Sequence, residues 1–196
     1  MSEIHARIRS RIKQQRRQLD LVSQQYASHE ATRLIRQQTF FINSQHIAVY
    51  WPMQGEISPL PLVELARRLG KHIYLPVLMP FLHNRLWFAP WHPHSKMKPN
   101  RFGIPEPVFH GKHLIPASSL DIVITPLVAF DPQCHRIGMG GGYYDRTFNF
   151  LRFRQHWHSP RMIGLAYEFQ KIKHITSQTW DVPLHAVVSQ KRLYKP

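Results

Sequence analysis

The sequence contains little cysteine, few acidic residues and no long apolar run. Its one cysteine in 196 residues, Cys134, excludes a disulfide bond within the chain and is typical of proteins in a reducing compartment. No stretch approaches the roughly 20 consecutive apolar residues that a membrane-spanning helix requires. We therefore expect neither a disulfide-stabilised secreted protein nor a membrane protein, and we expect the chain to work in the cytoplasm.

The shortage of acidic residues leaves the chain strongly basic. Only 11 Asp and Glu residues oppose 26 Lys and Arg residues, which gives a formal net charge of +15. Such a surface attracts anions, and nucleotides, polyglutamylated cofactors and nucleic acids are all anions. The charge does not choose among them, and part of it is expected only to keep the surface solvated. Residues 4–19 are rich in arginine but lack the apolar core of a secretory signal, so they are interpreted as the first helix.

The apolar content, 43% of residues, is sufficient for one compact domain, which we expect to span residues 1–196. Apolar residues at helical spacing predict helices at about 4–19, 28–41, 62–69 and 143–153. Short runs of β-branched and aromatic residues predict strands at 47–51, 73–78, 86–89, 121–125, 127–130, 162–166 and 186–188. This alternation predicts an α/β fold, a single layered domain with a mainly parallel central sheet flanked by helices.

Two boundary signals and one long loop complete this prediction. Ser58 is the expected N-cap of the third helix, with Pro59 just inside its start, and Gly70 is expected to end the helix. Residues 90–119 are rich in proline, histidine and polar side chains, and are expected to form a long surface excursion.

The segment from Asp121 to Phe148 carries the chemistry. A predicted buried strand leads into a loop, then into clustered glycines, then into the start of a helix. Ligands collect at the carboxyl ends of strands in open α/β sheets, and glycines let backbone N–H groups approach an anion closely. Arg136 could bind a phosphate through two N–H groups, and Asp145 could hold Mg²⁺ bridged to phosphates. The pattern predicts a phosphate-binding loop.

The glycine cluster matches neither common nucleotide motif. No Lys-Ser or Lys-Thr follows the glycines, and Tyr143 stands where a dinucleotide fingerprint has its third glycine. The alternative is a tight structural turn in which Asp145 is only a helix-end charge. Of the adjacent Tyr143 and Tyr144, at most one is expected to face a ligand. Cys134 is expected to lie in an exposed loop and to have no role.

Beyond these general patterns, the run from Arg136 to Arg146, RIGMGGGYYDR, resembles the signature of the 5-formyltetrahydrofolate cyclo-ligase (methenyltetrahydrofolate synthetase) family. Other segments fall in the family's order: the basic first helix, Met53–Glu56, Tyr74–Val77, Ile104–Pro107 and Trp180–Leu184. The resemblance implies an ATP- and Mg²⁺-dependent enzyme that converts 5-formyltetrahydrofolate to 5,10-methenyltetrahydrofolate and releases ADP and phosphate. It implies phosphorylation of the formyl oxygen, followed by attack of N10 on the formyl carbon.

The resemblance also implies roles for individual residues. The residues expected to contact ATP are His5, Ala6, Arg7, Ile8, Arg9, Arg136, Ile137, Gly138, Met139, Gly140, Gly141, Gly142, Tyr143 and Tyr144. Those expected to contact the folate are Arg9, Trp51, Glu56, Met139, Gly140, Gly141, Gly142 and Tyr143. Asp145 and Asp181 resemble the Mg²⁺ ligands, and Arg136, Tyr143 and Asp145 are the expected catalytic residues. His5 stands where many members carry lysine, so its phosphate contact is expected to be weaker or pH-dependent. Gly141 stands where some members carry lysine, which removes another positive charge.

Two other functions stay open at this stage. The charge favours an RNA-binding protein, although no RNP, KH or zinc-finger signature is present. The fold class would also suit another nucleotide or sugar-phosphate enzyme, because a fold does not determine a function. The expected partner is 5-formyltetrahydrofolate, with or without a polyglutamate tail, bound by a monomer that contacts no membrane.

Overall fold

A central sheet of seven strands organises the computed structural model, which describes residues 3–79, 85–109, 111–153 and 159–196. The strand order is β11-β10-β9-β6-β1-β2-β3. The bounds are β1 His46–Ala48, β2 His72–Leu78, β3 Leu86–Pro90, β6 Ile122–Pro126, β9 Arg161–Leu165, β10 Ala186–Val188 and β11 Leu193–Tyr194. Neighbouring inner strands from β10 to β2 are parallel, and the edge strands β11 and β3 are antiparallel. The predicted α/β fold with a mainly parallel sheet is confirmed.

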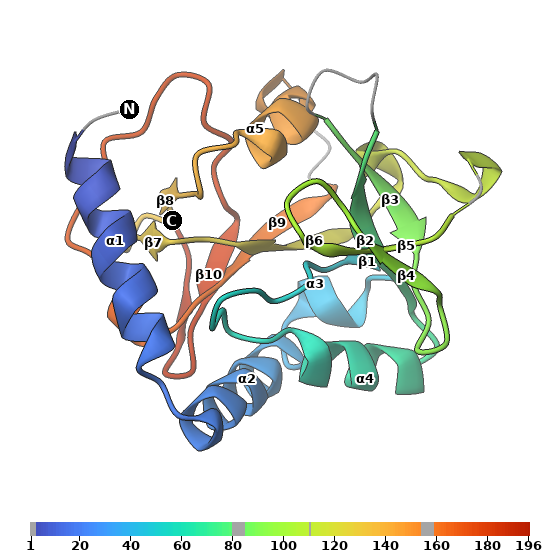
Figure 1. Ribbon diagram of the computed structural model, residues 1–196, viewed down its shortest axis with the longest axis horizontal. Coiled ribbons are helices and arrows are strands. Elements are labelled where there is room, and N and C mark those ends of the chain that lie inside the picture. Colours follow the sequence, from blue (N-terminus) through green and yellow to red (C-terminus); the bar gives the residue numbers. More distant parts are fainter. Residues whose placement is uncertain (1–2, 80–84, 110, 154–158) are drawn as a thin grey trace.

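Helices cover both faces of this sheet (Figure 1). Helices α2 (Leu21–Ile35) and α4 (Leu60–Arg68) lie on one face, and α5 (Tyr143–Phe148) lies on the other. Alternate strand residues divide between the two apolar clusters: Ile47 and Val49 pack on the α2 and α4 side, while Ala48 packs with Phe148. The inner strands are therefore apolar on both sides, as parallel strands between two helical layers require.

Three helix predictions need correction. The second helix starts at Leu21, not near residue 28, because the Asp20 carboxylate accepts a hydrogen bond from the Ser23 N–H at 2.7 Å and caps the helix there. It ends at Ile35, and the short helix α3 (Thr39–Ile42) follows. The N-cap of α4 is Pro59 and not Ser58, whereas Gly70, with φ +72°, ends that helix as expected. The last predicted helix is α5 followed by a 3₁₀ turn at Asn149–Phe153.

The stretch predicted as a surface excursion contributes to the core. It forms an antiparallel pair, β4 (Met97–Pro99) and β5 (Pro105–Pro107), and two 3₁₀ turns at Gly111–His113 and Ala117–Ser119. Trp91 is buried, and the Glu106 carboxylate, 5% exposed, accepts hydrogen bonds from the Leu78 N–H and the Asn100 side chain. Most of the described side chains in this stretch are exposed or half-buried, as predicted. The burial of Glu106 was not predicted, because it depends on partners distant in the chain that satisfy the carboxylate.

Helix α1 (Glu3–Arg17) confirms the predicted first helix and stands at one end of the sheet (Figure 1). It packs through Ile8 and Ile12 against Val128 and Ile137. These two residues belong to the segment around the hairpin of β7 (Ala129–Phe130) and β8 (Arg136–Ile137), which follows β6. Helix α1 therefore lies beside the carboxyl end of β6. In the described part of the chain, no helix is long and apolar enough to cross a membrane.

Candidate functional site

A narrow cavity opens where α1 meets the carboxyl ends of three parallel strands. Tyr50 follows β1, Leu127 follows β6, and Leu165 ends β9. The cavity contains about 140 Å³ of empty space, and nowhere is it wide enough for a water molecule. Its lining residues are Arg16, Tyr50, Glu56, Ile57, Pro126, Leu127, Leu165 and Gln170. The cavity therefore lies at the carboxyl ends of the parallel strands, where α/β proteins bind their ligands.

A buried ion pair forms one wall of this cavity. Nη1 of Arg16, whose side chain is 1% exposed, lies 3.2 Å from Oε1 of Glu56, and the other oxygen of Glu56 accepts the Met53 N–H at 3.1 Å. Burial raises the pKa of Glu56, although the Met53 N–H and the Arg16 charge oppose that rise. Gly55, with φ +72°, brings the loop against α1, because a Cβ there would lie 2.8 Å from the Arg16 carbonyl oxygen.

Burial raises the pKa of three tyrosine hydroxyls, which lie close enough to Glu56 for its charge to raise that pKa further. Tyr50 donates its hydroxyl hydrogen to the Ile57 carbonyl oxygen. Burial raises the pKa of the Tyr144 hydroxyl, and the negative charge of Glu56 raises it further. Burial likewise raises the pKa of Tyr167 to about 12. All three hydroxyls therefore stay neutral, and Tyr144 brings α5 within electrostatic range of Glu56.

The glycine cluster adopts a conformation that other residues rarely take. Gly140 and Gly142 have φ values of +103° and +63°, which is the left-handed region that glycine tolerates. Helix α1 is tied to this loop, because Nε of Arg9 donates to the Gly138 carbonyl oxygen at 2.8 Å. The structure thus brings together two segments predicted to contact ATP, although they lie far apart in the chain.

Arg136 and Asp145 form a second ion pair beside the loop. Nη2 of Arg136 lies 2.5 Å from Oδ1 of Asp145, which also accepts the Val182 N–H at 3.1 Å. The Val182 carbonyl oxygen in turn accepts a hydrogen bond from Nη1 of Arg136. This network brings Asp145 next to the backbone that carries Asp181, whose own carboxylate accepts the Gln178 N–H at 2.8 Å.

Asp145 and Asp181 are the two residues here that could contribute carboxylate ligands to a metal ion. Within the described residues, no group of three or more His, Cys, Asp and Glu side chains could hold a metal ion. Mg²⁺ is usually held by only one or two carboxylates together with waters and substrate phosphates. Oδ2 of Asp145 accepts no hydrogen bond from the part of the chain that is described, so one oxygen is left for a ligand.

Other predicted site residues lie at the margin of this arrangement. Trp51 packs edge-on against Trp91, with ring centroids 5.7 Å apart, and contributes to the core. The Tyr143 hydroxyl accepts a hydrogen bond from Arg101, and Met139 is 48% exposed. On α1, Ile8 is packed against apolar neighbours, and Arg7 pairs with Glu3 at the surface. His5 and Ala6 also lie on α1. The roles given to these residues stay predictions.

The sequence did not predict the burial of two residues, Arg16 and Cys134. Arg16 was not predicted, although it follows Ile8 and Ile12 at intervals of four residues and therefore lies on the same buried face of α1. Cys134 was predicted to be exposed and is fully buried, with φ +64°. Its thiol pKa is raised to about 11 by burial, so it is an unreactive core residue.

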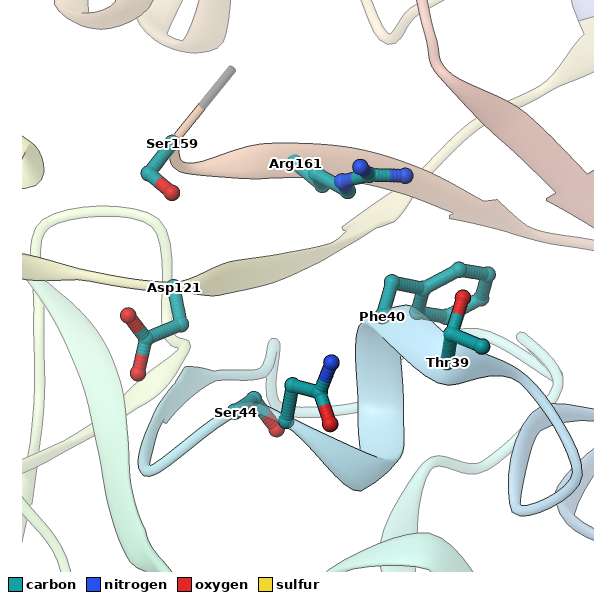
Figure 2. A pocket seen from close by; sticks show the side chains of 7 residues that line it. Thr39, Phe40, Ser44, Asp121, Ser159 and Arg161 are labelled. Carbon is teal, nitrogen blue, oxygen red and sulfur yellow. The ribbon is translucent and has the colours of Figure 1, made fainter. Parts of the chain in front are cut away.

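A more open hollow lies at the opposite end of the parallel strands, where β1, β6 and β9 begin (Figure 2). Its cavity volume is about 160 Å³, and it is lined by Thr39, Phe40, Asn43, Ser44, Asp121, Ser159 and Arg161. These residues come from α3 and its end and from the segments that precede or begin β6 and β9. The Asp121 carboxylate accepts the N–H groups of Gln45 and His46, so it holds the start of β1 in place. No predicted site residue lines this hollow.

Comparison with known proteins shows the family to which the sequence belongs. The sequence model of the 5-formyltetrahydrofolate cyclo-ligase family matches residues 1–190. The 5-formyltetrahydrofolate cyclo-ligase of Escherichia coli K12 is 38% identical over 184 residues, which cover 94% of this chain and 99% of that protein. The Haemophilus influenzae protein of the same name is 38% identical over 187 residues, covering 92% and 95%.

Solved structures show the same fold. The 5,10-methenyltetrahydrofolate synthetase of Aquifex aeolicus superposes with a TM-score of 0.78 at 25% identity, covering 98% of this chain and 92% of that one. The corresponding synthetase of Mycoplasma pneumoniae, at 22% identity, has a TM-score of 0.71, with coverages of 95% and 98%. Since the family match extends over nearly the whole length, the chain belongs to the 5-formyltetrahydrofolate cyclo-ligase family.

Proposed function

We propose that this chain carries out the cyclo-ligase reaction at the carboxyl ends of its parallel strands, between α1, the loop at residues 52–57 and the glycine loop. The chain is an ATP-dependent 5-formyltetrahydrofolate cyclo-ligase, which forms 5,10-methenyltetrahydrofolate. The placement is supported most strongly by one observation. The Arg136–Asp145–Val182 network holds a guanidinium group and a carboxylate beside the glycine loop, and the charges of both Arg136 and Glu56 act on the Tyr144 hydroxyl.

The nucleotide half of the proposed site comprises Arg9, the glycine loop and Arg136. The guanidinium groups supply positive charge, and the left-handed glycines keep the loop free of side chains where phosphate oxygens would approach its N–H groups. Gly141 adds to this, since a Cβ there would lie 2.9 Å from the Tyr143 ring. His5 and the other predicted residues of the first helix would lie toward the same nucleotide.

The folate half is the cavity around Glu56. A pterin carries N–H groups on its 2-amino and N3 positions, and a buried carboxylate is the natural acceptor for them. Tyr50, which the raised pKa keeps neutral, and Gln170 make the cavity lining polar without adding charge. Trp51 and the glycine-loop residues Met139 to Tyr143 would complete the contacts with the rest of the folate.

The chemistry requires a better leaving group than a formyl oxygen. In the proposed sequence the formyl oxygen attacks the terminal phosphorus of ATP, and ADP departs. N10 then attacks the formyl carbon and releases its proton to solvent, the five-membered ring closes, and the oxygen leaves as phosphate. Asp145 and Asp181 would hold Mg²⁺, which neutralises phosphate charge when it is bound. The protein contributes mainly alignment and charge stabilisation, as in other phosphoryl transfers.

The remaining features of the partner proposal concern the surface. We infer that the substrate can carry a polyglutamate tail, because α1 exposes Arg11 and Arg17 to an acidic ligand. The enzyme is proposed to act as a cytoplasmic monomer.

Mixing the purified protein with 5-formyltetrahydrofolate, ATP and Mg²⁺ and following methenyl absorbance tests the reaction. We expect turnover that needs both ATP and the metal. Arg136→Gln, which keeps hydrogen-bonding capacity but removes the charge, should abolish most of it while the protein stays folded. A folded wild-type protein without turnover under these conditions would contradict the proposed function.

A further inference from the structure

The guanidinium group of Arg16 has an edge without a partner. Nη1 contacts Glu56, but Nε and Nη2 are buried and donate hydrogen bonds to no atom of the described residues. These two nitrogens lie on the same side of the planar group and point their N–H bonds in parallel, as a fork. Leaving charged donors buried and unsatisfied is costly, so the edge is expected to be built for an acceptor that the protein itself does not supply.

A second polar group beside Arg16 is in the same condition. The Tyr167 hydroxyl is buried without a hydrogen-bond partner in the described ranges, and the positive charge of Arg16 acts on it. The cavity that Arg16 lines is too narrow for a water molecule, so water does not enter it to satisfy the guanidinium edge. A ligand ring that enters this space must therefore separate α1 from the loop at residues 52–57, which now lie in close contact.

The charge of the pair indicates what kind of acceptor fits. A guanidinium fork alone would suit a phosphate or a carboxylate. Here, however, the Glu56 carboxylate lies 3.2 Å from the same guanidinium group and would repel an anion. A neutral ligand that presents an acceptor and donors side by side matches the pair better. The pterin ring has such an edge, in which the 4-oxo oxygen accepts while N3–H and the 2-amino group donate.

We propose that Arg16 is a substrate-binding residue, whose free edge donates to the 4-oxo oxygen of the pterin while Glu56 accepts from N3–H and the 2-amino group. The inference rests on the proposed function and deepens it, because the Glu56–Arg16 pair then forms hydrogen bonds with three neighbouring groups of the ring: the 4-oxo oxygen, N3–H and the 2-amino group. It also explains why an ion pair is retained where apolar packing would suffice. A site built to hydrogen-bond a ligand rejects analogues that leave its buried groups unpaired.

Steady-state kinetics with three variants test the proposal. Arg16→Met removes the donors with little change in length, and it should raise the KM for 5-formyltetrahydrofolate about 10- to 100-fold while the KM for ATP changes little. Arg16→Lys keeps the charge beside Glu56 but lacks the fork, and it should also raise the folate KM. Arg68→Met, at the exposed end of α4, should behave as wild type. Thermal unfolding shows that each variant is folded.

Competitive inhibition by aminopterin, a folate analogue with an amino group in place of the 4-oxo oxygen, separates direct contact from a positioning role. In Arg16→Met or Arg16→Lys, the inhibition constant of aminopterin should change far less than the folate KM. Equal weakening of both would mean that Arg16 acts only by holding Glu56, and an unchanged folate KM in the folded variants would also overturn the proposal. An inactive wild-type enzyme would instead contradict the proposed function.

Discussion

At the scale of single residues, the site depends on carboxylates placed in different surroundings. Glu56 is buried, and its side chain is 12% exposed beside Arg16. The Asp145 side chain is 26% exposed and shares its Oδ1 between Arg136 and a backbone N–H. The first is suited to binding a neutral ring, and the second is open enough to reach a hydrated cation.

The protonation of Glu56 should be visible in the pH dependence of folate binding. Burial raises the pKa of Glu56 above its ordinary value of 4.5. As the pH falls through this raised pKa, the carboxylate is lost and the KM for folate should rise. Glu56→Gln should show a high folate KM with no such step. The measurement is the folate KM at saturating ATP, from about pH 8 down to about pH 5.

Protonation of Glu56 should weaken folate binding but increase the free energy of unfolding. Because its pKa is raised in the folded state, the folded chain holds this proton more firmly than the unfolded chain between pH 4.5 and the raised pKa. The contribution of Glu56 to the free energy of unfolding therefore increases as the pH falls through that window. Glu56→Gln should lack this contribution, and identical pH profiles for the two proteins would argue against a raised pKa.

Asp145→Asn should separate catalysis from stability. Asparagine keeps an oxygen for the Arg136 and Val182 hydrogen bonds, so the free energy of unfolding should fall by only about 1–2 kcal/mol. Turnover should fall roughly 100-fold or more, because the charge that would hold Mg²⁺ is lost. Urea unfolding and a Mg²⁺ titration of turnover provide the two measurements.

Asp121→Asn is the matched control for this change. Its carboxylate also accepts backbone N–H groups, at 2.7 and 2.8 Å, but Asp121 lies before the start of β6, at the opposite end of the parallel strands from the proposed site. This variant should lose stability and keep its turnover. If Asp145→Asn lost turnover only to the extent that Asp121→Asn did, Asp145 would be a structural residue.

At the scale of elements, the site depends on how closely the loop at residues 52–57 approaches α1. Gln54 and Gly55 both have positive φ values, +51° and +72°, which form the turn that directs Glu56 back toward Arg16. Sequence periodicity predicts α1 well, but it does not indicate which loop α1 will contact. That contact depends on the order of strands in the sheet and on the hairpin against which α1 packs.

Gly55→Ala should disturb this contact, with Gly70→Ala as its control. Both glycines have φ +72°, so both alanines should incur the left-handed backbone penalty of about 1–2 kcal/mol. Only the Cβ at residue 55 meets a neighbour, the Arg16 carbonyl oxygen at 2.8 Å, whereas residue 70 has open space. We expect Gly55→Ala to be less stable than Gly70→Ala and to raise the folate KM. Equal effects would show that the loop can move away freely.

At the scale of the whole molecule, the net charge of +15 should have two opposite effects. Self-repulsion destabilises the compact state, and the same field attracts anionic substrates. Added NaCl screens both, since the screening length shortens to about 3 Å at 1 M salt. The midpoint of thermal unfolding should therefore rise with salt while kcat/KM for ATP falls, and kcat at saturating substrates should stay constant. If kcat/KM for ATP did not change with salt, the net charge would not attract the substrate and would serve only to keep the surface solvated.

Much of the architecture followed from local patterns. Apolar spacing predicted α1 and α4, β-branched runs predicted the inner strands, and their alternation predicted the parallel sheet. The short edge strand β11 and the β4–β5 pair were missed, because their residues have weak local preferences and are held by partners elsewhere in the chain. Boundaries failed where a single capping contact, such as Asp20 with Ser23, decided them.

The sequence by itself determined the family, the α/β class and the glycine loop, because these depend on residue types at short, regular spacing. Only the tertiary structure decided which side chains meet there. Arg16 and Glu56 are 40 residues apart, and Asp145 and Val182 are 37 apart. Their contacts arise from strand order, from one glycine that permits a close approach, and from burial that leaves a guanidinium edge without a partner. No local pattern encodes such contacts, because they depend on how the whole chain packs.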